Sequence, residues 1–189
     1  MNAIVKEFPG QEGTFYRTNL PEPVPGPGQV KIKVMAASIC ASDIHALYNG
    51  LMADRYRYPV IIGHEGAGVV VEVGEGVEDI RVGDRVTAET TLTSCGTCEY
   101  CRKGETNMCA SRKGLGSAAD GYFANYCIAS AKYCHKLADD LSFEEGALAE
   151  PFACVVHAVC NLTHPMAGDL VLVVGPGPMG QMVAALAKA

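Results

Sequence analysis

Hydrophobic and polar residues alternate along much of the chain in short runs that are typical of β-strands. In residues 29–36, apolar Ile32 and Val34 alternate with lysines, which is the two-residue period of a strand with one buried face. Further β-like runs follow within residues 59–74 and 126–128, each bounded by Gly or Asp turn residues. Many short strands with few helices predict a mainly β domain, built as a small barrel or sandwich.

The pattern changes from strands to helices near Ser142. Ser142 and Glu145 have the spacing of a capping box, which predicts the start of a helix that Pro151 interrupts or restarts. A second helical pattern extends to about Leu162. Residues 169–189 then predict a buried strand, a glycine turn and the opening of a helix. The chain therefore combines a β-rich first part with a helical last part.

Composition and charge argue against two classes of partner. The 189 residues carry a formal net charge of −6, so the chain lacks the basic surface of a nucleic-acid-binding protein. Residues 170–187 are uncharged, but Pro176, Pro178 and three glycines within them argue against a membrane span. Residues 1–13 do not resemble a signal peptide. We expect a cytoplasmic protein, in which the nine cysteines are metal ligands or buried thiols rather than disulfides.

Four of these cysteines lie close together in the pattern C-x2-C-x2-C-x7-C: Cys95, Cys98, Cys101 and Cys109. Four thiolates complete the tetrahedral coordination of Zn2+ and leave no position for a substrate, which predicts a structural zinc ion. An iron-sulfur cluster is the alternative. The ferredoxin pattern has a shorter last gap and a proline after its final cysteine, whereas Ala110 follows here. Unliganded thiols are a third interpretation, which this spacing disfavours.

Three further motifs together suggest a second metal site: CASD at 40–43, GHE at 63–65 and AEP at 149–151. Each motif alone is a weak signal, because isolated Cys, His and Glu residues usually have structural roles. Together they supply sulfur, nitrogen and carboxylate ligands from distant parts of the chain. Three such ligands leave one coordination position vacant, as a catalytic zinc ion requires.

These motifs, in this order and together with EEGALAEP and GPGPMG, resemble the zinc-dependent medium-chain alcohol dehydrogenases. Within that superfamily the chain is similar to the sorbitol (L-iditol) and threonine dehydrogenase branch. The resemblance covers essentially the whole chain. It implies a mainly β fold with some α: a GroES-like β-barrel catalytic domain at residues 1–155, then the first βα unit of a Rossmann nucleotide-binding domain at residues 156–189.

The resemblance also implies an activity and its partners. The expected reaction is hydride transfer from a secondary alcohol or polyol to NAD or NADP, in a homodimer or homotetramer with two zinc ions per chain. A chain with one βα unit of the nucleotide domain is expected to be a fragment that binds dinucleotide weakly and is inactive alone. The alternatives from other classes are a non-catalytic GroES-like zinc-binding module and an iron-sulfur or thiol-redox protein.

The resemblance assigns metal ligands residue by residue. Cys40 and His64 match the catalytic zinc ligands of the family. Glu65 and Glu150 match carboxylates that bind the ion directly or through water. We expect Glu65 to be the third ligand and Glu150 to be exchangeable or water-bridged.

Three neighbours of Cys40 match other catalytic positions of the family. Ser42 matches the hydroxyl that passes the substrate proton toward solvent. Asp43 matches a carboxylate that orients the ligands, with a simple helix-start charge as its alternative. His45 matches a residue near the active site, and an exposed helix histidine is equally compatible with the sequence.

The glycine turn completes the predicted site. Residues 173–180 contain G-x-G-x-x-G after a predicted strand, a pattern that places a pyrophosphate at a helix N-terminus. The residues expected to contact the cofactor are Gly175, Gly177, Pro178, Met179 and Gly180. The acidic residue that would separate NAD from NADP is expected about twenty residues further on, beyond Ala189. The sequence therefore leaves the choice of dinucleotide open.

Overall fold

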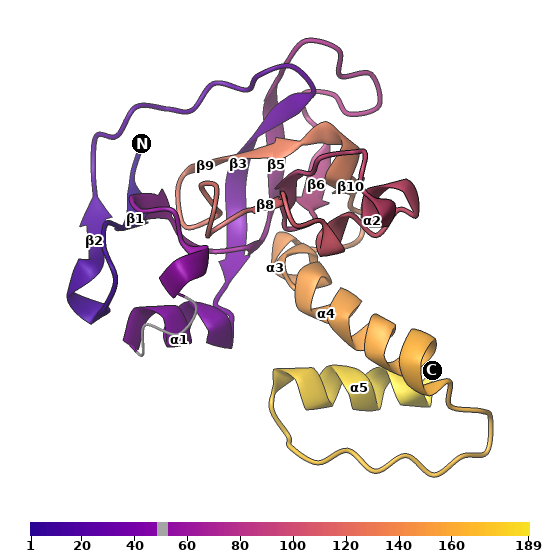
Figure 1. Ribbon diagram of the computed structural model, residues 1–189. Coiled ribbons are helices and arrows are strands. Elements are labelled where there is room, and N and C mark those ends of the chain that lie inside the picture. Colours follow the sequence, from indigo (N-terminus) through magenta and orange to yellow (C-terminus); the bar gives the residue numbers. More distant parts are fainter. Residues whose placement is uncertain (49–52) are drawn as a thin grey trace. The chain divides into compact units, whose positions relative to one another are not determined.

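The computed structural model describes residues 1–48 and 53–189, which form two compact units (Figure 1). The first unit, Met1–Ala147, is mainly β with short helices, and the second, Leu148–Ala189, is helical. The mainly β composition with some helices is confirmed. The structure divides the chain at residue 147, whereas the sequence places a boundary at residue 155, and that domain assignment stays a prediction.

A five-stranded antiparallel sheet in the order β10-β6-β5-β3-β9 forms the centre of the first unit. Its strands are β3 (Gln29–Ser38), β5 (Glu65–Val73), β6 (Arg85–Ala88), β9 (Tyr126–Ser130) and β10 (Cys134–Lys136). The strand predicted from alternation is confirmed, because Val30 and Ile32 are fully buried while Lys33 is exposed. β3 and β5 are the longest strands, and β3 ends and β5 begins at the candidate site described below.

Two smaller sheets share no strand with the five-stranded sheet. A three-stranded sheet has the order β2-β1-β4, from β1 (Ala3–Lys6), β2 (Thr14–Arg17) and β4 (Val60–Ile61), and β7 (Thr91–Thr93) pairs with β8 (Lys113–Gly114). The expected closed barrel is therefore not found in the part of the chain that the structure describes. Closure requires the two edge strands of a sheet to pair, and β9 and β10 do not pair with each other.

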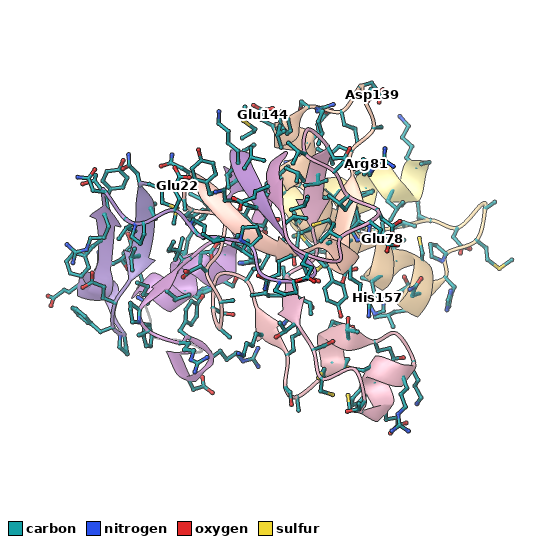
Figure 2. All side chains as sticks on the ribbon, turned by 90° about the horizontal axis from the view of Figure 1, so that it is seen from above. Glu22, Glu78, Arg81, Asp139, Glu144 and His157 are labelled. Atoms are coloured by element: carbon teal, nitrogen blue, oxygen red, sulfur yellow. The ribbon has the colours of Figure 1, made fainter. Side chains whose placement is uncertain are left out.

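Apolar side chains of the large sheet form the main core of the first unit. Its buried members are Val30, Ile32, Val70, Ile80, Val86, Ala88 and Ala129. Charged residues such as Glu22, Glu78 and Arg81 are exposed and project away from the ribbon (Figure 2). Because a close-packed core resists deformation, the strand ends that leave it have fixed positions.

Short helices lie between the strands of the first unit, and one follows its last strand. They are η1 (Gln11–Gly13), α1 (Ala41–Tyr48), η2 (Ala53–Arg55), α2 (Glu99–Arg102), η3 (Thr106–Met108), η4 (Ala131–Tyr133) and α3 (Phe143–Ala147). The capping box predicted at the start of α3 is confirmed. The Ser142 backbone N–H donates to Glu145 Oε2 at 2.7 Å, and the Glu145 N–H donates to Ser142 Oγ at 3.1 Å.

The second unit contains α4 (Ala149–Val156), the π-helix η5 (His157–Thr163) and α5 (Pro178–Lys188), with α4 packed against α5 (Figure 1). The helix restarts at Ala149, two residues before Pro151, which is buried in the first turn of α4. The helical pattern ends close to the predicted residue, because His164 adopts a left-handed conformation with φ 48°. No helix among the described residues combines the length and apolarity of a membrane span.

The prediction of a buried strand before the glycine turn was wrong. Residues 170–176 form no strand, and Leu170, Leu172 and Val174 are 99%, 85% and 91% exposed. A strand of this kind needs a neighbour to pair its backbone groups, and no described strand pairs with it. The turn and the helix do form, with Gly177 at the N-cap of α5 and Pro178 at its first position.

Candidate metal centres

Two groups of metal-ligating side chains converge within the described residues, and both belong to the first unit. Cys95, Cys98, Cys101 and Cys109 form one group, here called the four-cysteine lobe (residues 95–109), while Cys40, His64 and Glu65 form the other, here called the strand-end site. In each group, one ligand atom per residue lies within 4.8 Å of all the others. The sequence singled out both groups.

The backbone of the four-cysteine lobe turns its sulfur atoms toward one point. The N–H of Cys98 donates to Cys95 Sγ at 3.3 Å, and the N–H of Cys101 donates to Cys98 Sγ at 3.5 Å, which caps α2. The N–H of Cys95 donates to Cys109 Sγ at 3.4 Å. Gly96 takes φ 71°, which a glycine adopts without strain. These contacts bring four sulfur ligands together.

The acidity of the thiols reflects the same contacts. The backbone N–H groups of Thr97 and Cys98 lower the pKa of Cys95 to about 6. Although the Cys101 N–H favours the Cys98 thiolate, partial desolvation and hydrogen bonds with neighbouring thiols raise the pKa of Cys98 to about 11. A bound cation would take the place of such protons, since the thiolate is the form that ligates a metal. Four thiolates fit a structural zinc ion.

The strand-end site is assembled where two strands of the large sheet end. Cys40 lies between β3 and α1, and its side chain is half-buried. His64 and Glu65 lie at the start of β5, with the His64 side chain 18% exposed and Glu65 4% exposed. Because β3 and β5 are neighbours in the sheet, residues 24 or more positions apart in the sequence reach one place.

A close backbone contact holds the segment that precedes His64. Tyr122 N–H donates to the carbonyl oxygen of Gly63 at 2.9 Å, and Phe123 N–H donates to that of Ile62 at 3.0 Å. Gly63 has φ 91°, and a Cβ there would lie 2.5 Å from the Phe123 ring. Only glycine fits this conformation and this space, so the turn fixes the backbone position of His64.

Asp43 contacts two residues of the strand-end site, Cys40 and His64. Its Oδ2 accepts a hydrogen bond from the Cys40 N–H at 3.1 Å, and its Oδ1 lies 3.4 Å from His64 Nδ1. The first contact belongs to the start of α1, and the second is an electrostatic contact longer than a typical hydrogen bond. Burial lowers the pKa of His64, but Asp43 and Cys40 outweigh it and raise the pKa to about 9. Contact through Nδ1 leaves Nε2 for a cation.

Other residues singled out by the sequence fall into both units. Ser42 and His45 lie on α1 close to Cys40 in the sequence, with Ser42 half-buried and His45 exposed. Glu150 belongs to the second unit, in the first turn of α4, and its role as an additional ligand stays a prediction.

The glycine turn also belongs to the second unit. Gly175 has φ 111°, and a Cβ on Gly180 would lie 1.9 Å from the Gly175 carbonyl oxygen. Glycine at both positions therefore allows the chain to turn tightly into α5. Contact of Pro178 and Met179 with a dinucleotide stays a prediction.

Sequence reasoning missed two residues beside the strand-end site. The Ser38 hydroxyl donates a hydrogen bond to Glu65 Oε2. Tyr56 is half-buried, and burial, followed by the nearby Asp43, Tyr58 and Cys40, raises its pKa to about 12. No spacing rule marks either residue, because a serine at a strand end and a tyrosine in a loop are common.

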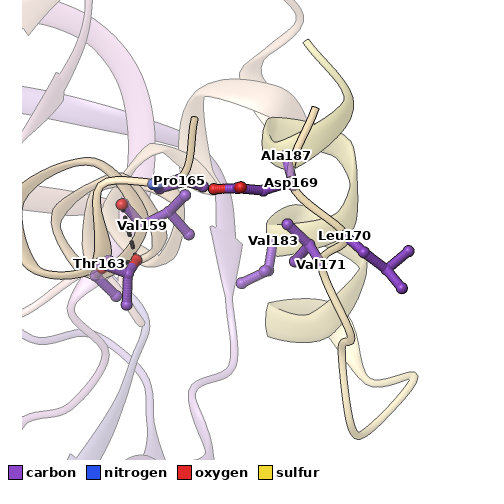
Figure 3. Close-up of a pocket in the computed structure, with 9 residues that line it drawn as sticks. Val159, Thr163, Pro165, Asp169, Leu170, Val171, Val183 and Ala187 are labelled. Carbon is purple, nitrogen blue, oxygen red and sulfur yellow. Dashed lines mark hydrogen bonds between the residues drawn. The ribbon is translucent and has the colours of Figure 1, made fainter. Parts of the chain in front are cut away.

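A cavity of about 540 Å³ in the second unit lacks the chemistry of such a site (Figure 3). Val159, Leu170, Val171 and Val183 give it a mainly apolar lining. Thr163, whose hydroxyl donates to the Val159 carbonyl at 2.9 Å, is among its few polar residues. The cavity contains no group of metal ligands.

Comparison with known proteins gives consistent matches. The family model for the alcohol dehydrogenase GroES-like domain matches residues 26–139. Sorbitol dehydrogenase from Halalkalibacterium halodurans is 47% identical over 188 residues, which cover 100% of this chain and 53% of that protein. L-threonine 3-dehydrogenase from Thermococcus kodakarensis is 42% identical over 190 residues, again 100% and 53%.

A solved structure agrees with both. The short chain alcohol dehydrogenase from Escherichia coli CFT073, complexed with NADH, has a TM-score of 0.85 and 37% identity, covering 100% of this chain and 53% of that one. The chain thus spans about half the length of the relatives it matches.

The family match includes the metal-ligating residues of both groups. All seven residues, from Cys40 to Cys109, fall within the matched range 26–139, which is more than half of the chain. The resemblance found in the sequence is confirmed. The chain belongs to the zinc-containing medium-chain alcohol dehydrogenase superfamily and contains its GroES-like domain.

Proposed function

We propose that this chain is the metal-binding part of a zinc-dependent dehydrogenase that transfers a hydride from a secondary alcohol or polyol to NAD or NADP. The observation that carries this proposal is the convergence of Cys40, His64 and Glu65 within 4.8 Å. Three such ligands leave one corner of a tetrahedral zinc ion vacant. The four-cysteine lobe leaves none, and we assign it a second, structural zinc ion.

The donor atoms of the strand-end site suit zinc. Thiolate sulfur, imidazole nitrogen and carboxylate oxygen are all ligands of catalytic zinc, and the burial of Glu65 favours pairing of its carboxylate with a cation. Zinc bound there would lower the pKa of a hydroxyl group that reaches the vacant position. Glu150 is assigned the role of an exchangeable or water-bridged ligand.

Residues of α1 carry the substrate proton to solvent in this proposal. Ser42 and His45 are three residues apart on one helix, a spacing that brings two side chains to the same face. Ser42 is half-buried and His45 is exposed, which is the order that outward proton transfer requires. Asp43 orients His64 and Cys40 and does not touch the substrate.

Hydride transfer needs a nicotinamide at the alcohol carbon. A nicotinamide bound beside the alcohol carbon would accept the hydrogen of that carbon with its electron pair, and Ser42 would pass the hydroxyl proton toward solvent. The products are a carbonyl compound, NADH or NADPH, and one proton. The turn at residues 175–180 and the N-terminus of α5 would bind the pyrophosphate, and the NADH in the related Escherichia coli structure supports this cofactor class.

The names of the relatives support a secondary alcohol as substrate. Sorbitol and L-threonine, after which the two curated relatives are named, both contain a secondary hydroxyl group. Sorbitol and L-iditol are therefore the first compounds to test. Assembly into a dimer or tetramer stays a prediction.

The vacant coordination position can be tested with Co2+ in place of zinc. Binding of a polyol at that position should shift the visible absorption bands of the strand-end site and leave those of the four-cysteine lobe unchanged. The variant His64→Ala should bind one metal ion fewer and lose the response. A wild-type chain with two metal ions and no response to any alcohol would instead indicate a non-catalytic zinc module.

Hydride transfer can be tested in a chimera. The second half of the Halalkalibacterium halodurans sorbitol dehydrogenase would follow Ala189 of this chain, and NADH and NADPH formation would be measured with sorbitol, L-iditol and L-threonine. We expect turnover with at least one of them, and none in the His64→Ala chimera. A folded, metal-loaded chimera that oxidises none would contradict the proposed substrate class.

A further inference from the structure

The last residue of β3 and the first residue of β5 face each other in the antiparallel ladder. The register pairs Ser38 with Glu65, and side chains of directly opposed residues lie on the same face of a sheet. The Ser38 hydroxyl donates a hydrogen bond to Glu65 Oε2. Ser38 therefore contacts the carboxylate that supplies the oxygen ligand of the strand-end site.

A bulge in β3 creates this pairing. The register shifts between Val34 and Ala36, so that Met35 is an additional residue in β3. Without it, the ladder beyond the bulge would slip by one position, and Ala37 would face Glu65 in place of Ser38. The irregularity thus places a hydroxyl, rather than a methyl group, opposite the carboxylate.

Burial makes this hydrogen bond consequential. Glu65 is 4% exposed, and a buried carboxylate is costly unless it is hydrogen-bonded or paired with a cation. The Ser38 hydroxyl engages Oε2. Oε1, which does not receive this bond, is the better oxygen to donate to a cation.

We propose that Ser38 is a positioning residue, which holds Glu65 in the orientation that presents one carboxylate oxygen beside Cys40 and His64. The inference rests on the proposed function, because it requires a metal ion in the strand-end site. Carboxylate ligands of metals are themselves hydrogen-bonded, and loss of such a partner typically weakens metal binding about 10–100-fold. Ser38 acts through Glu65 and touches neither substrate nor cofactor.

The experiment compares Ser38→Ala, Ser38→Thr and the control Ala37→Ser in the 189-residue chain. Zn2+ affinity is measured by competition with a chromophoric chelator, the ligand arrangement from the Co2+ spectrum, and folding by thermal unfolding. We expect Ser38→Ala to weaken the strand-end site about 10–100-fold and to shift its Co2+ bands. Ser38→Thr keeps a hydroxyl and should restore most of the affinity. Ala37→Ser should change neither, because strand alternation turns it to the opposite face.

The same substitution in a Glu65→Ala background separates positioning from general stabilisation. We expect no further loss when Ser38→Ala is added there, because its partner is already absent. An equal loss in both backgrounds overturns the inference, as does wild-type affinity and spectrum in Ser38→Ala. If the wild-type chain binds metal in the four-cysteine lobe alone, the proposed function fails, and the inference fails with it. Metal binding by the wild-type chain thus tests the proposed function, and the response to Ser38→Ala tests the inference.

Discussion

The four-cysteine lobe and the strand-end site differ in how the chain brings their ligands together. The lobe takes all its ligands from fifteen consecutive residues, held by backbone N–H groups that donate to sulfur. The strand-end site takes its ligands from the ends of β3 and β5, which are neighbours through the large sheet. The lobe is encoded by local spacing, and the strand-end site by the fold.

This difference predicts whether the order of each site depends on its metal ion or on the packed strands around it. The lobe contributes little to the apolar clusters of the first unit, of which it supplies no member, so we expect its order to depend on the metal. The strand-end site is attached to strands that pack in the core, so we expect its residues to keep their places without a metal ion. Loss of metal should therefore disorder the four-cysteine lobe, whereas the residues of the strand-end site should stay in place.

The largest expected effect follows from removal of one lobe ligand. Cys109→Ser should release the metal from the lobe and lower the free energy of unfolding by about 3 kcal/mol or more, because a structural metal site contributes folding energy directly. Metal content and thermal unfolding measure both effects. Cys160→Ser, at an exposed cysteine outside the lobe, should change neither. If Cys109→Ser lost its metal and kept the wild-type stability, the order of the lobe would not depend on the metal.

A pH titration should affect the strand-end site next most strongly. His64 ligates as a neutral imidazole, and its pKa is raised to about 9, so each pH unit below about 9 should weaken metal binding up to about tenfold. Chelator competition from pH 9 down to 7 would therefore show a loss of about a hundredfold.

The same shift has the opposite sign for the metal-free protein. The protonated imidazole is favoured in the folded state, so this contribution to stability is fully present below the ordinary pKa of 6.5 and is lost as pH rises through about 9. Asp43→Asn should reduce both dependences, because Asp43 is the largest of the contacts that raise this pKa. Metal affinity that is constant between pH 7 and 9 would contradict the account.

Removal of the charge that contacts His64 should have an intermediate effect. Asp43→Asn should weaken metal binding in the strand-end site about 10–100-fold at pH 9, where little proton competition at His64 remains, as expected for a partner of a metal ligand, and leave the lobe loaded. Chelator competition measures the change. Asp79→Asn, on an exposed loop, is the matched control. Equal weakening of both sites would show that the fold, rather than the contact, had changed.

The smallest effect is expected at Tyr56. Its pKa of about 12 keeps the phenol neutral near neutral pH, so it can donate a hydrogen bond to a polyol hydroxyl. Tyr56→Phe should weaken polyol binding to the Co2+ form by up to about tenfold, the size of one hydrogen bond, with metal affinity unchanged. Tyr100→Phe, on α2 of the lobe, should leave binding as it is. A loss of metal in Tyr56→Phe would place the residue in the metal site instead.

The sequence predicted features that depend on neighbours along the chain. The strand at β3 and the capping box at α3 follow from periodicity and spacing, and both are confirmed. The four-cysteine group was also visible in its spacing. Cys40, His64 and Glu65 were grouped from motifs that are individually weak, and the family resemblance was needed to assign them as ligands, because no local rule brings residues from two strands to one place.

Features that depend on tertiary partners were missed. Ser38 reaches Glu65 through a bulge at Met35, which strand alternation does not reveal. The apolar run at residues 170–174 has the composition of a buried strand, but composition does not supply the neighbouring strand that pairing requires. Closure of the barrel likewise depends on edge strands meeting, which periodicity does not encode.

The extended segment before α5 has a practical consequence for work in solution. Residues 170–176 combine exposed apolar side chains with backbone that no described strand pairs, and such a segment is a template for strand addition by another chain. In concentrated preparations of the 189-residue chain, residues 170–176 would therefore favour self-association. A charged residue placed in the run, such as Leu172→Lys, would act as a gatekeeper against that association while both metal centres, in the other unit, stayed as they are.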